Sequence, residues 1–230
     1  MSLFGTVQAP PSEQVQKARV RVAEMLQELD RYNPQSIPFL ENYVDLQCKA
    51  NFYDQEANLA VLKLYQFNPG SVRTEVIAQI LLKALTNLPH TDFVLCKCLI
   101  DLSHFGDRTL ETIMQLHSDL EQCEFQKVWT SLSSDLREVE GVLGFEDSIR
   151  NYIGIVVNKT YQRIDKRMLC EFLNVKEKDL KPWMDRFSWK AQGVNDIFIA
   201  NHEESIKTKS ILEKITFESV EQIMANSQAK

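Results

Sequence analysis

Apolar positions recur every three or four residues through much of the first 135 residues of this chain. The first such stretch begins near Ser12, and its apolar residues are Val15, Ala18, Val22, Met25, Leu26 and Leu29. This spacing places them along one face of a helix whose other faces are charged. The helix is expected to end at residues 31–34, because Pro34 restricts the residue before it to extended conformations.

The same pattern predicts further helices up to residue 143. A second helix begins near Ser36, with Ile37, Leu40, Val44 and Cys48 facing inward. A third begins at Asp54 and is apolar on most faces, which predicts a central position. Ser71 is expected to cap a fourth helix after Pro69, and others begin near Thr91, Asp107 and Cys123. The residues predicted to be buried in the fourth helix are Val76, Ile77, Ile80, Leu81, Ala84 and Leu85. In the last of these helices they are Phe125, Val128, Trp129 and Leu132.

These helix starts recur every 16 to 24 residues, so that a two-helix unit takes roughly 35–40 residues. That length is typical of tetratricopeptide and HEAT repeats, although no consensus letters recur between the units. The chain is therefore predicted to be mainly α, with a HEAT- or TPR-like array in which each unit buries its apolar face on its neighbours.

A different order of elements follows Gly141 and Gly144, which are interpreted as a helix stop between domains. After a helix over residues 146–161 come a short strand at 162–164 and a helix from Asp165 to Leu173, with Met168, Leu169 and Phe172 facing inward. A second short helix spans residues 176–187 and buries Leu180, Met184 and Phe187. Residues 188–191 and 197–200 then alternate in polarity around a turn, which predicts a hairpin. This order is typical of a winged helix.

The predicted domains are a disordered lead over residues 1–11, a helical-repeat domain over 12–143, a winged-helix domain over 144–218 and a C-terminal tail over 219–230. The tail follows a polar stretch, and residues 217–224 are expected to form a closing helix. Charge supports a boundary near residue 144. Residues 1–144 hold 12 Lys and Arg against 19 Asp and Glu, a net charge of −7, whereas residues 145–230 carry +1.

The composition, with 44% hydrophobic and 25% charged residues, is typical of a soluble globular protein. No signal peptide begins the sequence, and no apolar run approaches the ~20 residues that span a bilayer. The five cysteines, Cys48, Cys96, Cys98, Cys123 and Cys170, all fall in apolar helical patterns. We expect buried, reduced thiols, and hence a cytoplasmic protein, with the nucleus left open as a second location.

One candidate site for chemistry does not withstand inspection of its spacing. Cys96 and Cys98 lie near His90 and His104, but residues two apart on a helix point about 200° apart and cannot converge on one tetrahedral ion. No glycine-framed serine, phosphate-binding glycine loop or zinc-protease motif is present. The sequence therefore predicts no enzyme activity, no cofactor, no metal and no small-molecule substrate.

The second short helix of the predicted winged helix is the candidate contact surface. It exposes Lys178, Lys181 and Asp185 on one face, with Glu177 and Asp179 beside them. Winged helices often read DNA with this helix, and a nucleic-acid-binding adaptor is thus the alternative function. The mixed charges favour protein contact instead, because phosphate binding needs clustered Lys and Arg. Trp183, Trp189 and Phe198 are either core residues or interface anchors, and we include Trp189 and Phe198 in the predicted contact set.

Six segments resemble one protein family in order and spacing. They are RYNP at 31–34, ANLAVLKLYQFNP at 57–69, AQILLKALTNLPHTD at 78–92, GFEDS at 144–148, EESIK at 203–207 and EKI at 213–215. All six resemble the subunit k family of eukaryotic translation initiation factor 3. The similarity extends from about residue 25 to the C-terminus, whereas residues 1–20 and 103–118 diverge from the family.

This resemblance implies a HEAT-like helical domain followed by a winged helix, related to the PCI modules of the factor's other subunits. It also implies a peripheral subunit without catalysis, in a factor that binds the small ribosomal subunit and organises initiation. The partner that it implies most directly is subunit l, itself a PCI-type protein. The family provides no catalytic residues to transfer to this sequence.

Overall fold

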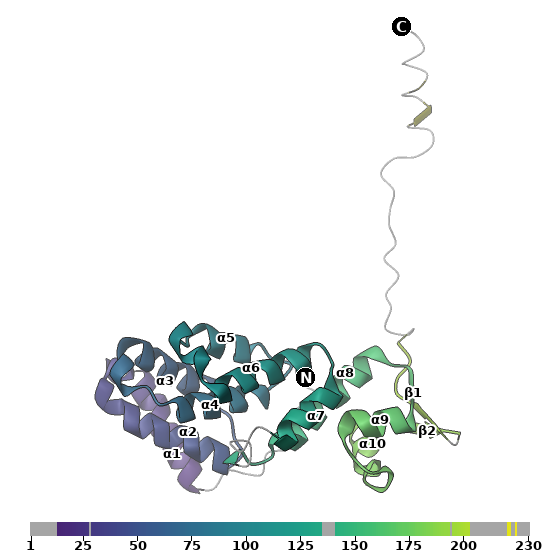
Figure 1. Cartoon of the computed structure of the whole chain (residues 1–230), viewed down its shortest axis with the longest axis horizontal. Helices are drawn as coiled ribbons and strands as arrows, with labels where there is room; N and C mark the ends of the chain where they lie inside the picture. The colour runs from purple at the N-terminus through teal and green to yellow at the C-terminus, as the bar shows by residue number, and fades with distance from the viewer. Residues whose placement is uncertain are drawn as a thin grey trace. The chain divides into compact units, whose positions relative to one another are not determined.

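The computed structural model describes residues 13–27, 29–134, 141–193, 195–202, 220, 221 and 224 (Figure 1). Contacts within the chain divide it into two units, Met1–Ile199 and Ala200–Lys230. The helices and strands with assigned bounds belong to the first unit. The fold is mainly helical, as predicted. None of the helices in the described ranges is both long and apolar enough to span a membrane.

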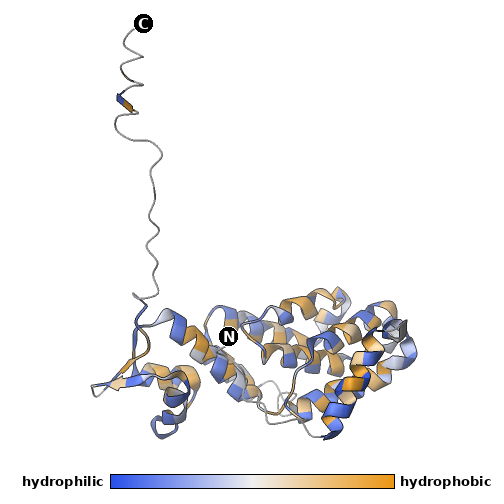
Figure 2. Ribbon diagram, turned by 180° about the vertical axis from the view of Figure 1, so that it is seen from behind, coloured by the Kyte–Doolittle hydropathy of each residue, from blue (hydrophilic) through white to orange (hydrophobic). Residues whose placement is uncertain are grey.

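The first part of the chain forms successive helices joined by short turns. They are α1 (Glu13–Gln27), η1 (Leu29–Tyr32), η2 (Pro34–Ser36), α2 (Ile37–Lys49), α3 (Gln55–Phe67), η3 (Pro69–Ser71), α4 (Thr74–Leu85), α5 (Asp92–Cys98), η4 (Leu102–Gly106), α6 (Arg108–Glu121) and α7 (Phe125–Ser134), where η denotes a 3-10 helix. Hydrophobic positions follow one side of most of these helices in Figure 2. The predicted apolar stripes therefore form the core.

Helix α4 occupies the centre of this part. It packs against α2, α3, α5, α6 and α8 (Phe145–Thr160), and nearly every residue from Val76 to Leu85 is buried. The sequence instead predicted α3 as the central helix. Helix α3 also buries residues on several faces, but two of them are small alanines, Ala57 and Ala60, which allow close approach of its neighbours.

Aspartates begin several helices, as the sequence predicted. The carboxylate of Asp54 accepts a hydrogen bond from the backbone nitrogen of Ala57, and Asp107 caps α6 in the same way. The prediction that Ser71 caps α4 is wrong. Ser71 ends the short turn η3, Val72 is extended, and α4 begins only at Thr74 with no side-chain cap.

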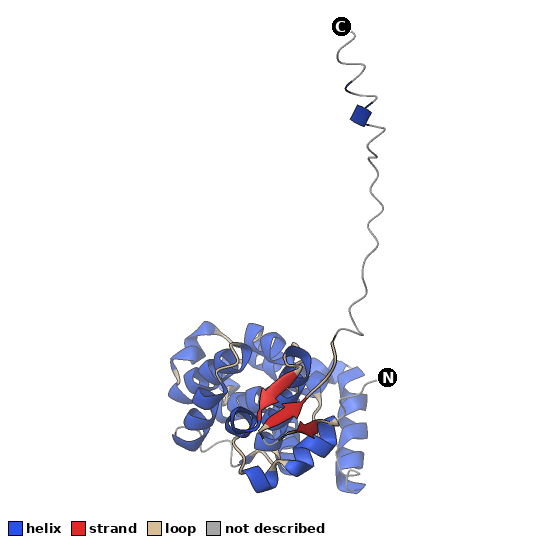
Figure 3. Ribbon diagram, turned by 90° about the vertical axis from the view of Figure 1, so that its right-hand side faces the viewer, coloured by secondary structure: helices blue, strands red, loops and turns tan. Residues whose placement is uncertain are grey.

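After α8 the chain forms a small three-stranded sheet with short helices. The elements are β1 (Arg163–Asp165), α9 (Lys166–Leu173), η6 (Glu177–Asp179), α10 (Lys181–Phe187), β2 (Lys190–Gln192) and β3 (Asp196–Phe198). Both pairings are antiparallel in the order β1-β3-β2, with Ile197 opposite Ile164 on one side and Ala191 on the other (Figure 3). The predicted strand, two helices and hairpin are thus present in that order.

Three local predictions in this part need correction. Met184 and Phe187 were expected to be buried, but both are half-buried, and only Leu180 of that set lies in the core. Met168 was expected to face inward, but its side chain is 43% exposed, and Leu169 and Leu173 are the buried residues of α9. The second short helix is also divided, because η6 precedes α10. Pro182, near the start of α10, lacks the N–H that would continue a helix from η6.

The link before α8 packs on the end of α2. The backbone nitrogen of Leu143 donates to the main-chain oxygen of Cys48, at 3.0 Å. Gly144 has φ +74°, and a Cβ atom there would lie 2.7 Å from the side-chain nitrogen of Asn51. Glycine is therefore required here both by the backbone conformation and by the close approach of α2.

Several predictions fall on residues outside the described ranges. These are the lead over residues 1–11, the polar segment from 203 onward and most of the closing helix and tail, of which only residues 220, 221 and 224 are described. The domain boundaries at residues 143 and 218 stay predictions.

Candidate interaction site

The predicted contact residues do not all lie on the surface. Lys178 in η6 and Lys181 and Asp185 in α10 are exposed, and Phe198 in β3 is half-buried. Trp189, in contrast, is only 4% exposed. The structure thus exposes the three charged side chains, leaves the ring of Phe198 partly accessible, and buries Trp189.

Trp189 is held in the interior by two neighbours. Its indole nitrogen donates to the Oδ1 atom of Asn158, at 3.2 Å, and its ring stacks on Phe187 with centroids 4.8 Å apart. Gly154 of α8 makes room for the Phe187 ring, because a Cβ atom at that position would overlap it. Of the two interpretations that the sequence left open, burial favours the core for this tryptophan.

The charges around this face are mixed and partly paired. The ammonium of Lys166 lies 2.6 Å from the carboxylate of Glu177. This ion pair raises the pKa of Lys166 and lowers the pKa of Glu177. The Arg186 guanidinium lies over the ring of Trp183, 5.5 Å from its centroid. An anionic backbone would meet acidic side chains here as well as basic ones, which favours a protein partner.

A second polar arrangement joins α7, α8 and α9. The indole nitrogen of Trp129 donates to the main-chain oxygen of Phe172, at 2.8 Å, and the Nε atom of Arg150 donates to that of Leu173, at 3.1 Å. Both acceptors lie at the end of α9, where helix carbonyls lack partners within the helix. A shallow groove of about 550 Å³ runs beside this junction. The sequence analysis missed Arg150, although its spacing from Glu146 predicts an ion pair on one helix face.

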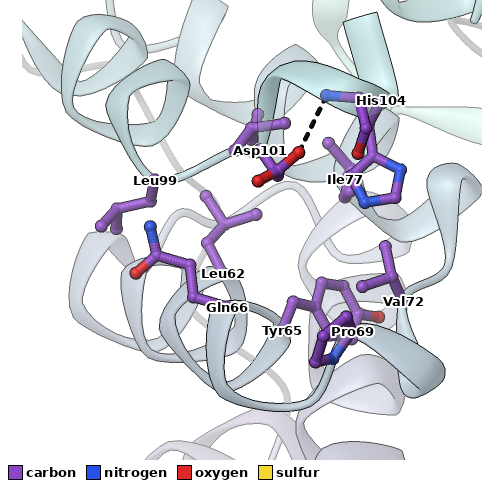
Figure 4. Close-up of a pocket in the computed structure, with 11 residues that line it drawn as sticks. Leu62, Tyr65, Gln66, Pro69, Val72, Ile77, Leu99, Asp101 and His104 are labelled. Carbon is purple, nitrogen blue, oxygen red and sulfur yellow. Dashed lines mark hydrogen bonds between the residues drawn. The ribbon is translucent and has the colours of Figure 1, made fainter.

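A deeper pocket of about 450 Å³ lies between the end of α3, η3, α4 and the link from α5 into η4 (Figure 4). In Figure 4, Gln66 and Leu99 stand on one side of the opening and His104 stands on the other. The buried side chains of Leu62 and Ile77 line its apolar part, and Asp101 lies at its polar part. Sequence reasoning missed this pocket, because only the fold brings these segments together.

The thiols are only partly as predicted. Cys48 and Cys96 are buried, and burial raises their pKa values to about 11 and about 12. Cys98 and Cys123 are exposed and Cys170 is half-buried, so the prediction of five buried thiols is wrong. Cys123 follows the end of α6 with φ +60° and lies outside any helix. Cys96 and Cys98 differ in burial because they lie on different faces of α5, as the helix geometry predicted.

The polar clusters inside the fold are built from structural hydrogen bonds. The Asp92 carboxylate accepts from the side-chain amides of Gln55 and Asn87, at 3.0 and 2.6 Å. The amides of Gln47 and Asn58 bind each other in the core. Within the described ranges, His, Cys, Asp and Glu side chains form no group of three that could hold a metal ion.

The side-chain arrangements described above do not identify a protein family, but comparison with known proteins does. The sequence model of the CSN8/PSMD8/EIF3K family matches residues 71–210. Eukaryotic translation initiation factor 3 subunit K of Homo sapiens is 52% identical over 214 residues, which are 93% of this chain and 98% of the human protein. The chain belongs to the subunit K family. The proteins of that name in Xenopus laevis and Nematostella vectensis are 52% and 45% identical.

The subunit K relatives match along almost their whole length, not within one domain. The match to the wider CSN8/PSMD8/EIF3K family runs from the end of η3 through α4 and the three-stranded sheet. It therefore includes the Trp129 and Arg150 junction, the exposed face of η6 and α10, and much of the pocket lining.

Proposed function

We propose that this chain is a non-catalytic interaction subunit of eukaryotic translation initiation factor 3, acting in assembly of the initiation complex on the small ribosomal subunit. The observation that carries this proposal is the 52% identity to a subunit K protein over 93% of the chain. An insertion or a lost domain would have shortened that match. The polar clusters described above, which serve the fold rather than a reaction, support a role without catalysis.

The architecture that goes with this role is a HEAT-like array over residues 12–143 followed by a winged helix over 144–218. Successive packing of α2, α4, α6 and α7 supports the array. The order β1, α9, α10, β2 and β3, with β3 in the middle of the sheet, supports the winged helix. A winged helix of this kind relates the chain to the PCI modules of the other subunits.

The partners that we propose are other subunits of the factor, above all subunit l, and the small ribosomal subunit through the assembled factor. The proposed contact face consists of Lys178, Lys181, Asp185 and Phe198. Its three charged side chains are exposed, and the half-buried ring of Phe198 supplies apolar area. Aromatic rings surrounded by polar side chains are typical of protein interfaces. A cytoplasmic location follows from this role.

The test is recovery of the factor with a tagged full-length chain and with a variant that carries Lys178→Glu and Lys181→Glu. We expect the unaltered chain to recover the other subunits in near-equal amounts, and the variant to recover less of subunit l. The matched control reverses two exposed lysines elsewhere, Lys17→Glu and Lys127→Glu, and should recover the factor normally.

Three outcomes decide between the proposals. Recovery of no other subunit by the unaltered chain would contradict the proposed function. Normal recovery by the Lys178 and Lys181 variant would contradict the proposed contact face only. Salt-sensitive binding of RNA or DNA by the free chain, with no factor subunit recovered, would favour the nucleic-acid-binding adaptor instead.

A further inference from the structure

The pocket between α3, α4 and η4 has an apolar floor that the fold does not fill. Leu62 and Ile77 are 1% and 2% exposed, and Ile100, which also lines the pocket, is 7% exposed. These residues belong to three different segments and are fixed by the core behind them. At about 450 Å³ the pocket is large enough to receive one or two large apolar side chains.

An acidic side chain, Asp101, lies at the polar edge of this pocket. The Oδ1 atom of Asp101 accepts a hydrogen bond from the backbone nitrogen of Ser103, at 2.8 Å, and hydrogen bonds from Ser103 lower the pKa of Asp101. The carboxylate is therefore ionised at neutral pH. A charge interaction with His104, which also lines the pocket, lowers the pKa of Asp101 as well.

Glu41, which is hydrogen-bonded to the lining residue Tyr65, has its charge neutralised. Glu41 accepts a hydrogen bond from the hydroxyl of Tyr65, at 2.6 Å, and pairs with the guanidinium of Arg73, at 3.2 Å. Asp101 is the acidic residue among those that line the pocket. A cation from another molecule is the complementary group.

An exposed leucine extends the apolar surface past the edge of the pocket. Leu102 lies between the lining residues Asp101 and Ser103, and its side chain is 83% exposed. Leu95 of α5 is also 45% exposed. Single exposed leucines are ordinary, but one whose neighbours in the chain line an open apolar pocket adds apolar area that a partner could cover.

We propose that this surface binds a segment of a neighbouring protein subunit that inserts a large apolar side chain into the pocket, covers Leu102 and places a Lys or Arg against Asp101. A protein segment fits better than a small molecule, because the exposed side chain of Leu102 is not part of the pocket lining and a ligand inside the cavity would leave it uncovered. Apolar anchors in pockets with charges at the rim are typical of protein interfaces. That the neighbour is a subunit of the initiation factor rests on the proposed function.

The test places a photo-crosslinking phenylalanine analogue at Ser103 or at Gln66, on opposite sides of the opening, in the tagged full-length chain. A third protein carries it at the exposed residue Glu24 of α1 as a control. After irradiation of the purified assembly, mass spectrometry identifies the attached peptides. We expect both pocket positions to crosslink to the same segment of one other subunit, and this segment should hold a large apolar residue next to a Lys or Arg. The control position should crosslink to a different segment or to none.

Two variants then test the chemistry of the contact. Asp101→Asn keeps a side-chain oxygen that can cap η4 but removes the charge, and it should lower the crosslink yield from Gln66 roughly two- to fivefold. Leu102→Ser changes a side chain that is already exposed, so folding should be unaffected, while the yield should fall roughly tenfold.

The results separate this inference from the proposed function. If the tagged chain recovers the other subunits but neither pocket position crosslinks, or both variants crosslink normally, the inference is wrong and the proposed function stands. If no factor subunit is recovered, the proposed function is wrong. In that case, crosslinks from both pocket positions to a segment of another protein that carries an apolar and a basic residue would still support the pocket chemistry. The absence of such crosslinks would overturn it.

Discussion

The indole nitrogen of Trp129 donates a hydrogen bond to the main-chain oxygen of Phe172, across the predicted boundary at residue 143. Arg150 adds a second bond to Leu173, and its guanidinium lies 5.1 Å from the centroid of the Trp129 ring. Helices α7 and α8, one from each predicted domain, therefore satisfy the carbonyls at the end of α9 together.

Trp129→Phe keeps most of the apolar ring but leaves the Phe172 carbonyl without its donor. We expect this variant to lose about 1–3 kcal/mol of unfolding free energy, which is typical of a buried acceptor left unpaired. Urea unfolding followed by circular dichroism measures it. Trp183→Phe serves as the control, since Trp183 is only half-buried. Equal stabilities of the two variants would show that the hydrogen bond to α9 carries no stability.

Gly154→Ala tests the packing of α8 against α10. The added Cβ atom would overlap the ring of Phe187, which stacks on Trp189, so the aromatic pair must move. Overpacking of this kind destabilises by about 1–3 kcal/mol. Gly106→Ala is the matched control, because nothing lies within 4 Å of its added atom. A melting temperature unchanged in Gly154→Ala would contradict the close packing of α8 and α10.

The burial of the thiols predicts their order of alkylation. Cys98 and Cys123 are exposed and should react first with iodoacetamide at pH 7.5. Burial raises the pKa of Cys48 from 9.0 to about 11, which reduces its thiolate population about a hundredfold, and the pKa of Cys96 rises further, to about 12. Peptide mass spectrometry over time gives the five rates. Labelling of Cys96 as fast as Cys98 would show that α5 does not bury its inner face.

Lys83 predicts a dependence of stability on pH. Its side chain is 1% exposed in α4, and burial lowers its pKa from the ordinary 10.5. Between the lowered value and 10.5 the unfolded chain binds more protons than the folded chain, so folded stability rises with pH through that interval. At pH values below the lowered pKa, the free-energy cost of burying the ammonium is constant.

Lys83→Met removes this cost while keeping a similar length of side chain. We expect the variant to be more stable than the parent by about 1–3 kcal/mol at pH 7, and the difference to shrink as the pH approaches 10. Chemical unfolding at the two pH values measures it. A variant less stable than the parent at pH 7 would mean that the ammonium is compensated in the folded protein.

Local signals in the sequence predicted the helices and strands well, and failed where the tertiary structure decides. Asp54, Asp107 and Asp165 all cap the helices that follow them, because a cap is a contact between residues two or three apart. Met168 has the same helical spacing as a buried residue, yet no element covers it. Ser71 is a good capping residue, but Pro69 directs it into a short turn before α4.

The candidate sites show the same division. The exposed charges of Lys178 and Lys181 could be predicted from their place in an amphipathic pattern. The pocket could not, because Leu62, Ile77 and Asp101 are distant in the sequence and meet only when α3, α4 and η4 pack. Trp189 could be assigned to core or surface only after its hydrogen bond to Asn158 and its stacking on Phe187 were known.

Sedimentation of the native chain tests the central claim most directly. A cell extract is layered on a sucrose gradient, and the chain, subunit l and a protein of the small ribosomal subunit are followed through the fractions. The account predicts that the chain sediments with the other factor subunits and, in part, with the small ribosomal subunit. Recovery of the chain at the top of the gradient as a free single protein, with the remaining subunits sedimenting together without it, would contradict the account.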